Sequence, residues 1–165
     1  MLDIAQKHIE ELKRLHLNTW YDEKYKFYNY RTWCETPKIS ENTWDYHDFV
    51  SLNKEGKVIG GISYSVNRDG DIAYGLGIIN FTDDMLTFGK DVHRAVRDVF
   101  EKFGFHKLKC SVVIGNPIES TYDRLIAKYG GCIVGIDRQD TKLWDGKYYD
   151  VKRYEILKED YFKCR

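Results

Sequence analysis

The architecture of this chain is decided by residues 76–131, LGIINFTDDMLTFGKDVHRAVRDVFEKFGFHKLKCSVVIGNPIESTYDRLIAKYGG. The stretch begins as an apolar strand and passes through a loop, residues 80–88, into a helix. This helix carries an apolar stripe that would pack on a sheet: Phe88, Val92, Val96, Val99, Phe100 and Phe103. A further strand leads to Asn116, a capping residue that opens a second helix, and Gly130-Gly131 closes that helix. The pattern therefore predicts strand, helix, strand and helix in succession.

The flanking residues predict more strands. Three apolar or alternating runs, separated by hairpin turn signals, come before the central stretch: Asp48–Asn53, Lys57–Val66 and Asp71–Ile79. Glycine is unfavourable in a strand, so four glycines in these runs predict bulges or close approach of another group: Gly60, Gly61, Gly75 and Gly77. Two strands and a short helix are predicted after the central stretch: Cys132–Asp137, Lys147–Leu157 and Lys158–Cys164.

The N-terminal region has a different pattern. Helical spacing of apolar residues predicts a helix over 3–17, and His8 and His16 fit boundary residues of that helix better than metal ligands. The segment that follows is dense in aromatic residues: Trp20, Tyr21, Tyr25, Phe27, Tyr28, Tyr30, Trp33 and Trp44, with a loop signal at Pro37. Tyr21, Tyr25 and Tyr28 would share one helix face. These rings either cover the core or form the wall of a substrate cleft, and the pattern leaves both interpretations open.

The length of 165 residues fits one domain with one core. We expect a single α/β (α+β) domain over 1–165, with a helical, aromatic-rich region over 1–45 and a core over 48–162. The mixed order of elements predicts a mostly antiparallel sheet of about six to seven strands with helices on both faces.

Composition excludes several classes of protein. The 26 basic and 26 acidic side chains cancel, so no overall field attracts nucleic acid. No apolar run approaches the roughly 18 residues of a membrane span, and no signal peptide is visible, so we expect a cytoplasmic protein without a membrane partner. No cysteine pair has metal-ligand spacing, and no metal site is expected. The chain has four cysteines: Cys34, Cys110, Cys132 and Cys164. Cys110 and Cys132 fall in apolar runs and are predicted to be core residues.

The most specific motif is the tail of the chain. It reads Gly130-Gly131-x-x-x-Gly135-x-x-Arg138, followed by Asp145-Gly146-Lys147-x-x-Asp150-x-x-x-Tyr154-x-x-Leu157. Together with the helix, strand, Asn116 and helix before it, this tail resembles the GNAT superfamily of acyl-CoA-dependent N-acetyltransferases, in particular the ribosomal-protein N-terminal acetyltransferases. The resemblance covers about residues 49–162.

The resemblance implies an acetyl-CoA site. In this superfamily the strand before the central helix diverges from its neighbour and holds the pantetheine arm, and the helix N-terminus binds the pyrophosphate. The implied cofactor-binding residues are Ile79, Asn80, Thr87, Phe88, Gly89, Lys90 and Asn116. The loop signature is incomplete, since Leu86 and Asp91 occupy two of its three positions. Asp83, Asp84 and Asp91 would also repel a phosphate unless Lys90 and Arg94 compensate.

The resemblance implies a catalytic tyrosine on the second helix. The position that commonly holds it is Ile126, and Tyr122 lies one turn earlier on the same face. Tyr122 is our candidate for the acid that protonates the leaving thiolate, although its place on an apolar stripe also fits a core tyrosine. Asp71 and Glu119 are weak candidates for the general base.

The sequence is compatible with two functions. The first is an N-acetyltransferase that moves an acetyl group from acetyl-CoA to a primary amine of a small molecule or peptide. The second is a GNAT-like binding or assembly module whose CoA site is degenerate. The sequence identifies neither the acceptor amine nor the oligomeric state, for which a homodimer is one option.

Overall fold

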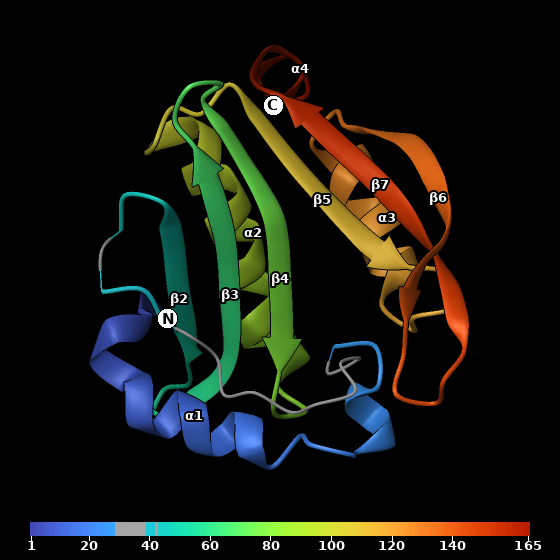
Figure 1. Ribbon diagram of the computed structural model, residues 1–165. Helices are drawn as coiled ribbons and strands as arrows, with labels where there is room; N and C mark the ends of the chain where they lie inside the picture. The colour runs from blue at the N-terminus through green and yellow to red at the C-terminus, as the bar shows by residue number, and fades with distance from the viewer. Residues whose placement is uncertain (29–38, 42) are drawn as a thin grey trace.

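The computed structural model describes residues 1–28, 39–41 and 43–165. In these residues a seven-stranded sheet has the order β1-β2-β3-β4-β5-β7-β6 (Figure 1). Neighbouring strands are antiparallel except β4 and β5, which are parallel. The strands are β1 (Leu2–Ile4), β2 (Tyr46–Leu52), β3 (Val58–Asn67), β4 (Ile72–Asn80), β5 (Lys107–Val113), β6 (Cys132–Lys142) and β7 (Tyr148–Leu157). The helices are η1 (Ala5–His8), α1 (Ile9–Leu17), η2 (Glu23–Tyr25), α2 (Met85–Glu101), α3 (Glu119–Lys128) and α4 (Lys158–Lys163), where η denotes a 3₁₀ helix.

Glycines in the strands permit a bulge and a close contact, as their positions predicted. Gly75 has a φ of +67° and lies in β4, where the pairing with β3 shifts between Ser63 and Ser65. A Cβ atom on Gly60 would lie 2.3 Å from the Phe88 ring. Glycine at this position therefore allows α2 to pack directly on β3.

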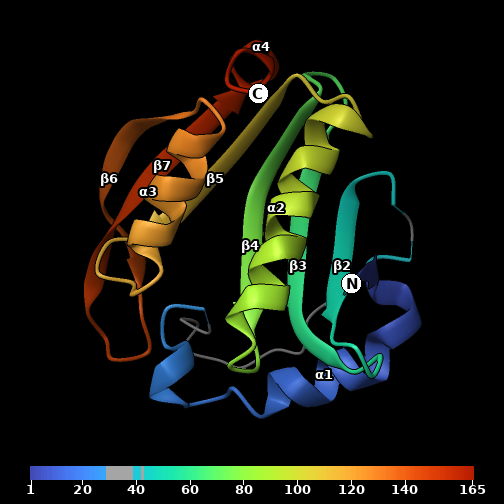
Figure 2. The ribbon, with the colours of Figure 1, turned by 180° about the vertical axis from the view of Figure 1, so that it is seen from behind.

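Helices cover both faces of the sheet, as expected. Figure 2 shows α2 and α3 side by side on one face. Gly60 points toward α2, whereas a Cβ on the next residue, Gly61, would lie 3.7 Å from Leu12 of α1. Successive strand residues face opposite sides, so α1 lies on the other face of the sheet. We call these two sides the α2 face and the α1 face.

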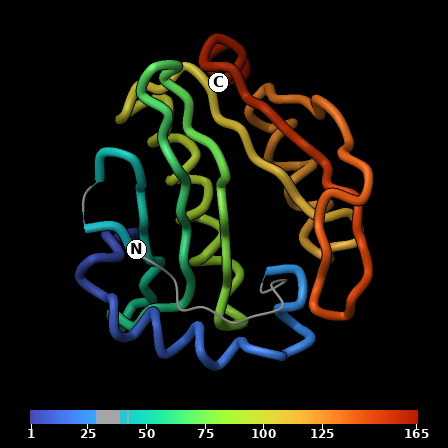
Figure 3. The backbone as a smooth tube through the Cα atoms, viewed as in Figure 1, coloured from blue at the N-terminus to red at the C-terminus, as the bar shows by residue number. Residues whose placement is uncertain are grey.

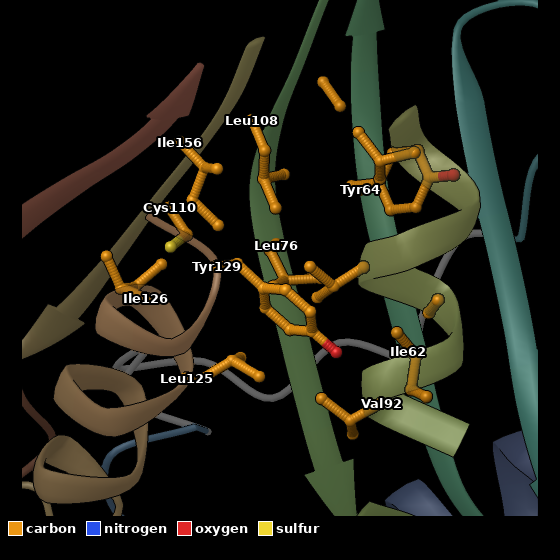
Figure 4. Packing of buried hydrophobic residues seen from close by; sticks show 14 of the residues in the cluster. Ile62, Tyr64, Leu76, Val92, Leu108, Cys110, Leu125, Ile126, Tyr129 and Ile156 are labelled. Carbon is orange, nitrogen blue, oxygen red and sulfur yellow. The ribbon is translucent and has the colours of Figure 1, made fainter. Parts of the chain in front are cut away.

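The main core lies between the sheet and the α2 face helices. Figure 4 shows Leu76 of β4, Cys110 of β5 and Ile126 of α3 converging in this core. Cys110 is buried, as predicted, and burial raises the pKa of its thiol to about 12. The prediction for Cys132 is wrong, because this residue begins the edge strand β6 and its side chain is exposed.

The predicted N-terminal helix is correct only in its second half. Leu2–Ile4 forms β1 and pairs with β2 at Phe49–Ser51, η1 follows, and the α-helix begins at Ile9. These residues therefore form a strand, although their apolar spacing predicted a helix. Pairing with a strand more than 40 residues away overrides that local pattern.

The described part of the aromatic segment is not an α-helix. Tyr21 has a φ of +59°, and the one helical turn that the structure describes between Tyr21 and Tyr28 is η2. Tyr21, Tyr25 and Tyr28 therefore do not share a helix face. Three other residues of the segment, Tyr30, Trp33 and Pro37, lie outside the described residues, as does Cys34. Within the described ranges, no helix is both long and apolar enough to span a membrane.

Candidate active site

A gap between β4 and β5 is the main feature of the candidate site. Their parallel pairing covers only Ile72–Tyr74 of β4 and Lys107–Lys109 of β5. Beyond this pairing β4 continues to Asn80 and β5 to Val113, and the two strands diverge (Figures 1 and 3). One edge of β4 is therefore left without a strand partner in the described structure. This is the divergence that the resemblance implied.

The ladder between β3 and β4 decides which backbone groups face the gap. The Phe81 N–H donates to the Ile59 carbonyl at 2.9 Å, which sets the phase of the ladder. Alternate residues of an antiparallel strand bond to the same neighbour, so the Ile79 backbone is directed toward β3. The backbone groups of Ile78 and Asn80 are directed toward the gap. The register therefore agrees with the role expected of Asn80, disagrees with that of Ile79, and adds Ile78.

The N-terminus of α2 lies earlier than the sequence pattern predicted. The helix begins at Met85, so Gly89 belongs to its first turns rather than to a loop. Asp84 causes this start, because its carboxylate accepts the Thr87 N–H at 3.0 Å and its carbonyl accepts the Phe88 N–H at 3.2 Å. These two N–H groups were expected to bind phosphate, but both already have partners. The Phe88 side chain is buried in the core.

Open space remains beside the first turns of α2. A Cβ on Gly89 would meet no atom within 4 Å, and the neighbouring Lys90 is exposed. Asp91, expected to repel phosphate, is instead turned toward the sheet. Its carboxylate accepts the Ser51 hydroxyl at 2.7 Å and pairs with the Met1 ammonium at 3.0 Å. The Asp91 charge is therefore compensated within the fold.

Tyr122 reaches the gap from the α2 face. Its hydroxyl donates to the Leu76 carbonyl at 3.3 Å, immediately after the β4 bulge. Burial raises the pKa of Tyr122, and Cys110, Tyr28 and Tyr154 add to the shift. The phenol is therefore protonated at neutral pH, as a proton donor must be. Ile126, at the position that commonly holds the tyrosine, is 2% exposed and lies in the core.

The other predicted site residues are engaged in local structure. The Asn116 side chain accepts the Ile118 N–H at 3.1 Å and stabilises the turn before α3. The predicted cap is wrong, because α3 begins at Glu119 and its N-cap residue is Ile118. Glu119 pairs with Lys152, which lowers the Glu119 pKa. Asp71 lies in the β3–β4 turn, at the paired end of β4 and β5. Neither carboxylate faces the gap as a free base.

The first part of the aromatic segment, residues 20–28, lies below the open end of the gap (Figures 1 and 3). Lys26 pairs with Asp145 of the β6–β7 turn at 2.9 Å, and the rings of Phe27 and Tyr149 lie 6.0 Å apart. This segment therefore connects α1 to the β6–β7 hairpin beneath the gap. Its position is consistent with the interpretation that part of it forms the wall of a cleft.

A pocket on the α1 face was not predicted. Its volume is about 110 Å³, and it is lined by residues that include Leu12, His16, Asp48, Gly61, Ser63 and Ile79. These side chains come from α1, β2, β3 and β4, so only the sheet register brings them together. The alternation of β2 could have placed Asp48 on the same face as Val50, but no local signal indicates a pocket there. Among the described residues, no group of His, Cys, Asp and Glu side chains could hold a metal ion.

His16 should make the fold sensitive to acid. Burial lowers the His16 pKa from 6.5 to about 4. As pH falls below the unfolded value, the unfolded chain takes up the proton first, so stability is lost through this window. We expect a loss of about 2 kcal/mol between about pH 7 and about pH 5 that His16→Phe removes. Urea unfolding at the two pH values measures this loss of stability. His106→Gln, at an exposed position, is the control and should leave the loss unchanged.

The fold formed by this divergent sheet is shared with solved structures of an N-acetyltransferase. A crystal structure of spermidine N-acetyltransferase from Vibrio cholerae in complex with CoA and spermine superposes with a TM-score of 0.76 at 19% identity, covering 98% of this chain and 97% of that chain. The same enzyme with manganese ions has a TM-score of 0.73 at 20% identity over 99% and 95% of the two chains. No protein-family model and no curated protein sequence matches this chain. At this level of identity the likeness establishes the fold.

Proposed function

We propose that this protein is an acetyl-CoA-dependent N-acetyltransferase acting on a primary amine. The observation that carries this proposal is the Tyr122 hydroxyl on the Leu76 carbonyl, at the point where β4 leaves β5. This arrangement combines a protonated acid with a strand edge that has free backbone groups. An acyl transfer from a thioester to an amine needs both of them.

Each part of the gap has a role in this proposal. Bound acetyl-CoA supplies the thioester whose carbonyl the amine attacks. The backbone of Ile78 and Asn80 would bind the pantetheine amides along the unpaired edge of β4. The open side of α2 at Gly89, with Lys90, would receive the pyrophosphate. As the amine nitrogen forms the C–N bond and the C–S bond breaks, Tyr122 would donate its proton to the thiolate that leaves, and the proton that the amine nitrogen loses would restore the phenol.

We infer that the acceptor is an aliphatic amine and that the reaction takes place in the cytoplasm, where acetyl-CoA is available. Solved structures of similar fold include spermidine N-acetyltransferases, which favours a polyamine-like acceptor. The tail motif from Gly130 to Leu157 still resembles the ribosomal-protein N-terminal acetyltransferases. A peptide N-terminus is therefore the acceptor to test against a polyamine.

A binding module with a degenerate CoA site is the second candidate. Asp84 caps α2 with a carboxylate where a pyrophosphate would sit, and the exposed Asp83 is next to it. Two aromatic side chains of the N-terminal region, Tyr21 and Trp44, are also 72% and 65% exposed. Exposed rings of this kind favour contact with a partner.

Acetyl-CoA binding separates the two candidates. At about 100 times Kd, a bound ligand adds about 2.7 kcal/mol, so the melting temperature should rise by about 5 to 10 °C. Asp84→Ser keeps a capping hydroxyl and removes a charge that opposes phosphate. We therefore expect it to lower the acetyl-CoA Kd by about fivefold in calorimetry.

Asp83→Ser is the matched control for this measurement, because Asp83 is exposed and does not cap the helix. It should lower the Kd less than Asp84→Ser does. A protein that shows neither a thermal shift nor a heat of binding is not an acetyltransferase, and the binding-module function would replace the proposal. Binding gained only in Asp84→Ser would identify the cap as the group that closes the site.

A further inference from the structure

The Asp48 carboxylate lies in the pocket on the α1 face with few hydrogen-bond donors. It is partly buried, and its hydrogen bond comes from the Ser40 backbone N–H at a long 3.4 Å. Burial raises the Asp48 pKa. Among the described residues, no Lys or Arg forms an ion pair with this carboxylate. A desolvated anion with one long hydrogen bond is costly unless a ligand supplies further donors.

A second acceptor beside Asp48 also lacks a donor. The Gln6 amide nitrogen donates to the Ser40 carbonyl at 2.7 Å, so Gln6 and Asp48 contact the same residue. The Gln6 Oε1 atom is buried and has no hydrogen-bond partner in the described structure. His16, on the pocket wall, has a pKa of about 4 and is neutral at neutral pH. Among the described lining residues, the pocket therefore offers the Asp48 carboxylate and no positive charge, which suits a primary ammonium with its three donors.

The sheet register connects this pocket to the reaction site. Asp48 pairs with Ser63, and Ser63 pairs with Gly77, so the three residues form a row across β2, β3 and β4. Two strand spacings place Asp48 about 10 Å from Gly77. Gly77 follows Leu76, whose carbonyl binds the Tyr122 hydroxyl. Ser63 has a small side chain and Gly77 has none, so this row adds little bulk to the α1 face.

We propose that the Asp48 pocket binds a second ammonium group of the acceptor and selects linear aliphatic amines with a cation about 10 Å from the reacting nitrogen. This inference rests on the proposed acetyltransferase function. It assigns Asp48 a role in specificity, because the carboxylate is too far from the gap to touch the reacting atoms. The distance from Asp48 to Gly77 then sets the preferred separation of the two nitrogens in the substrate.

The test compares linear diamines of increasing length with monoamines of matching length. In the native protein, the diamine whose nitrogens lie about 10 Å apart should have a KM about 10- to 100-fold below that of its monoamine. Asp48→Asn, which keeps the side-chain shape, should remove this difference by raising the diamine KM. It should leave the monoamine KM unchanged and alter kcat by less than about threefold. Asp69→Asn, in the exposed β3–β4 turn, is the control and should change neither KM.

Gly61→Ala is a second variant that does not depend on the Asp48 charge. Its new Cβ would lie 3.4 Å from Ile79 and 3.7 Å from Leu12, so the fold accepts it while the pocket becomes smaller. It should raise the diamine KM and leave the monoamine KM unchanged. If Asp48→Asn fails to fold, Gly61→Ala decides the question.

The outcomes separate this inference from the function on which it rests. Equal KM values for diamine and monoamine in the native protein would overturn the pocket and leave the acetyltransferase standing. If no amine is acetylated and acetyl-CoA does not bind, the function fails. Titration of the diamine into the protein without acetyl-CoA then tests the pocket. Heat that disappears in Asp48→Asn would support it, and no heat would overturn it.

Discussion

Tyr122→Phe should lower kcat by about 100-fold or more, because it removes the acid that protonates the leaving thiolate. The phenol donates to the Leu76 carbonyl beside the gap, and like an ordinary tyrosine it is protonated at neutral pH. The variant retains the ring and its packing against Tyr154, whose ring centroid is 6.1 Å away. Loss of one hydrogen bond should cost about 1 kcal/mol of stability. The Kd for acetyl-CoA should stay within about twofold, since phenylalanine fills the same space.

Tyr129→Phe is the matched control for this prediction. Tyr129 is a second buried tyrosine of the same core, and its hydroxyl contacts His93 at 2.9 Å rather than the gap. Its loss should change stability by a similar amount and leave kcat within about threefold. Steady-state kinetics and calorimetric titration of both variants give the comparison. An unchanged kcat in Tyr122→Phe would remove this residue from the mechanism.

Gly131→Ala should destabilise the protein by about 3 kcal/mol or more, because the site between α3 and β7 has no room for a methyl group. The new Cβ would lie 2.5 Å from the Glu155 carbonyl oxygen and 2.7 Å from the Ile126 side chain. The first of these contacts is with backbone, which cannot rotate away. For a domain of this size the melting temperature should fall by about 6 to 12 °C. Activity should fall as well, since α3 carries Tyr122.

Gly135→Ala, in the edge strand β6 that follows Gly131, is the control. A Cβ on Gly135 would meet no atom within 4 Å. Its stability should therefore change by less than about 0.5 kcal/mol. Thermal unfolding of both variants measures the difference, and equal melting temperatures would contradict the close packing of Gly131 between the helix and β7.

Much of the fold could be predicted because its signals are local. The turn sequences before β3 and β4 and the apolar stripe of α2 are visible within a few residues. Predictions failed where a distant partner decides the outcome. Leu2–Ile4 is a strand because β2 is available to pair with it, and Cys132 is exposed because β6 lies at the edge of the sheet. The start of α2 was predicted too late for a different reason. Gly89 was interpreted as a loop residue, whereas Asp84, a local capping signal, sets the start of the helix at Met85.

The candidate site divides in the same way. The family resemblance implied a tyrosine on the second helix and a divergent strand pair, and the structure contains Tyr122 on α3 and the divergence of β4 from β5. Which residues face the gap depends on the phase of the β3–β4 ladder, and this phase directs Ile78 and Asn80, rather than Ile79, toward it. A shift by one residue would exchange them without any change in the sequence pattern.

By itself, the sequence determined the kinds and the order of the elements from β2 to α4, and it offered Tyr122 as a candidate acid. Those properties follow from periodicity and from the preferences of glycine, asparagine and aspartate for turns and caps. Only the tertiary structure decided that Asp48, Ser63 and Gly77 form one row leading to Tyr122. Strand register is set by contacts between residues far apart in the chain, so no local pattern contains it.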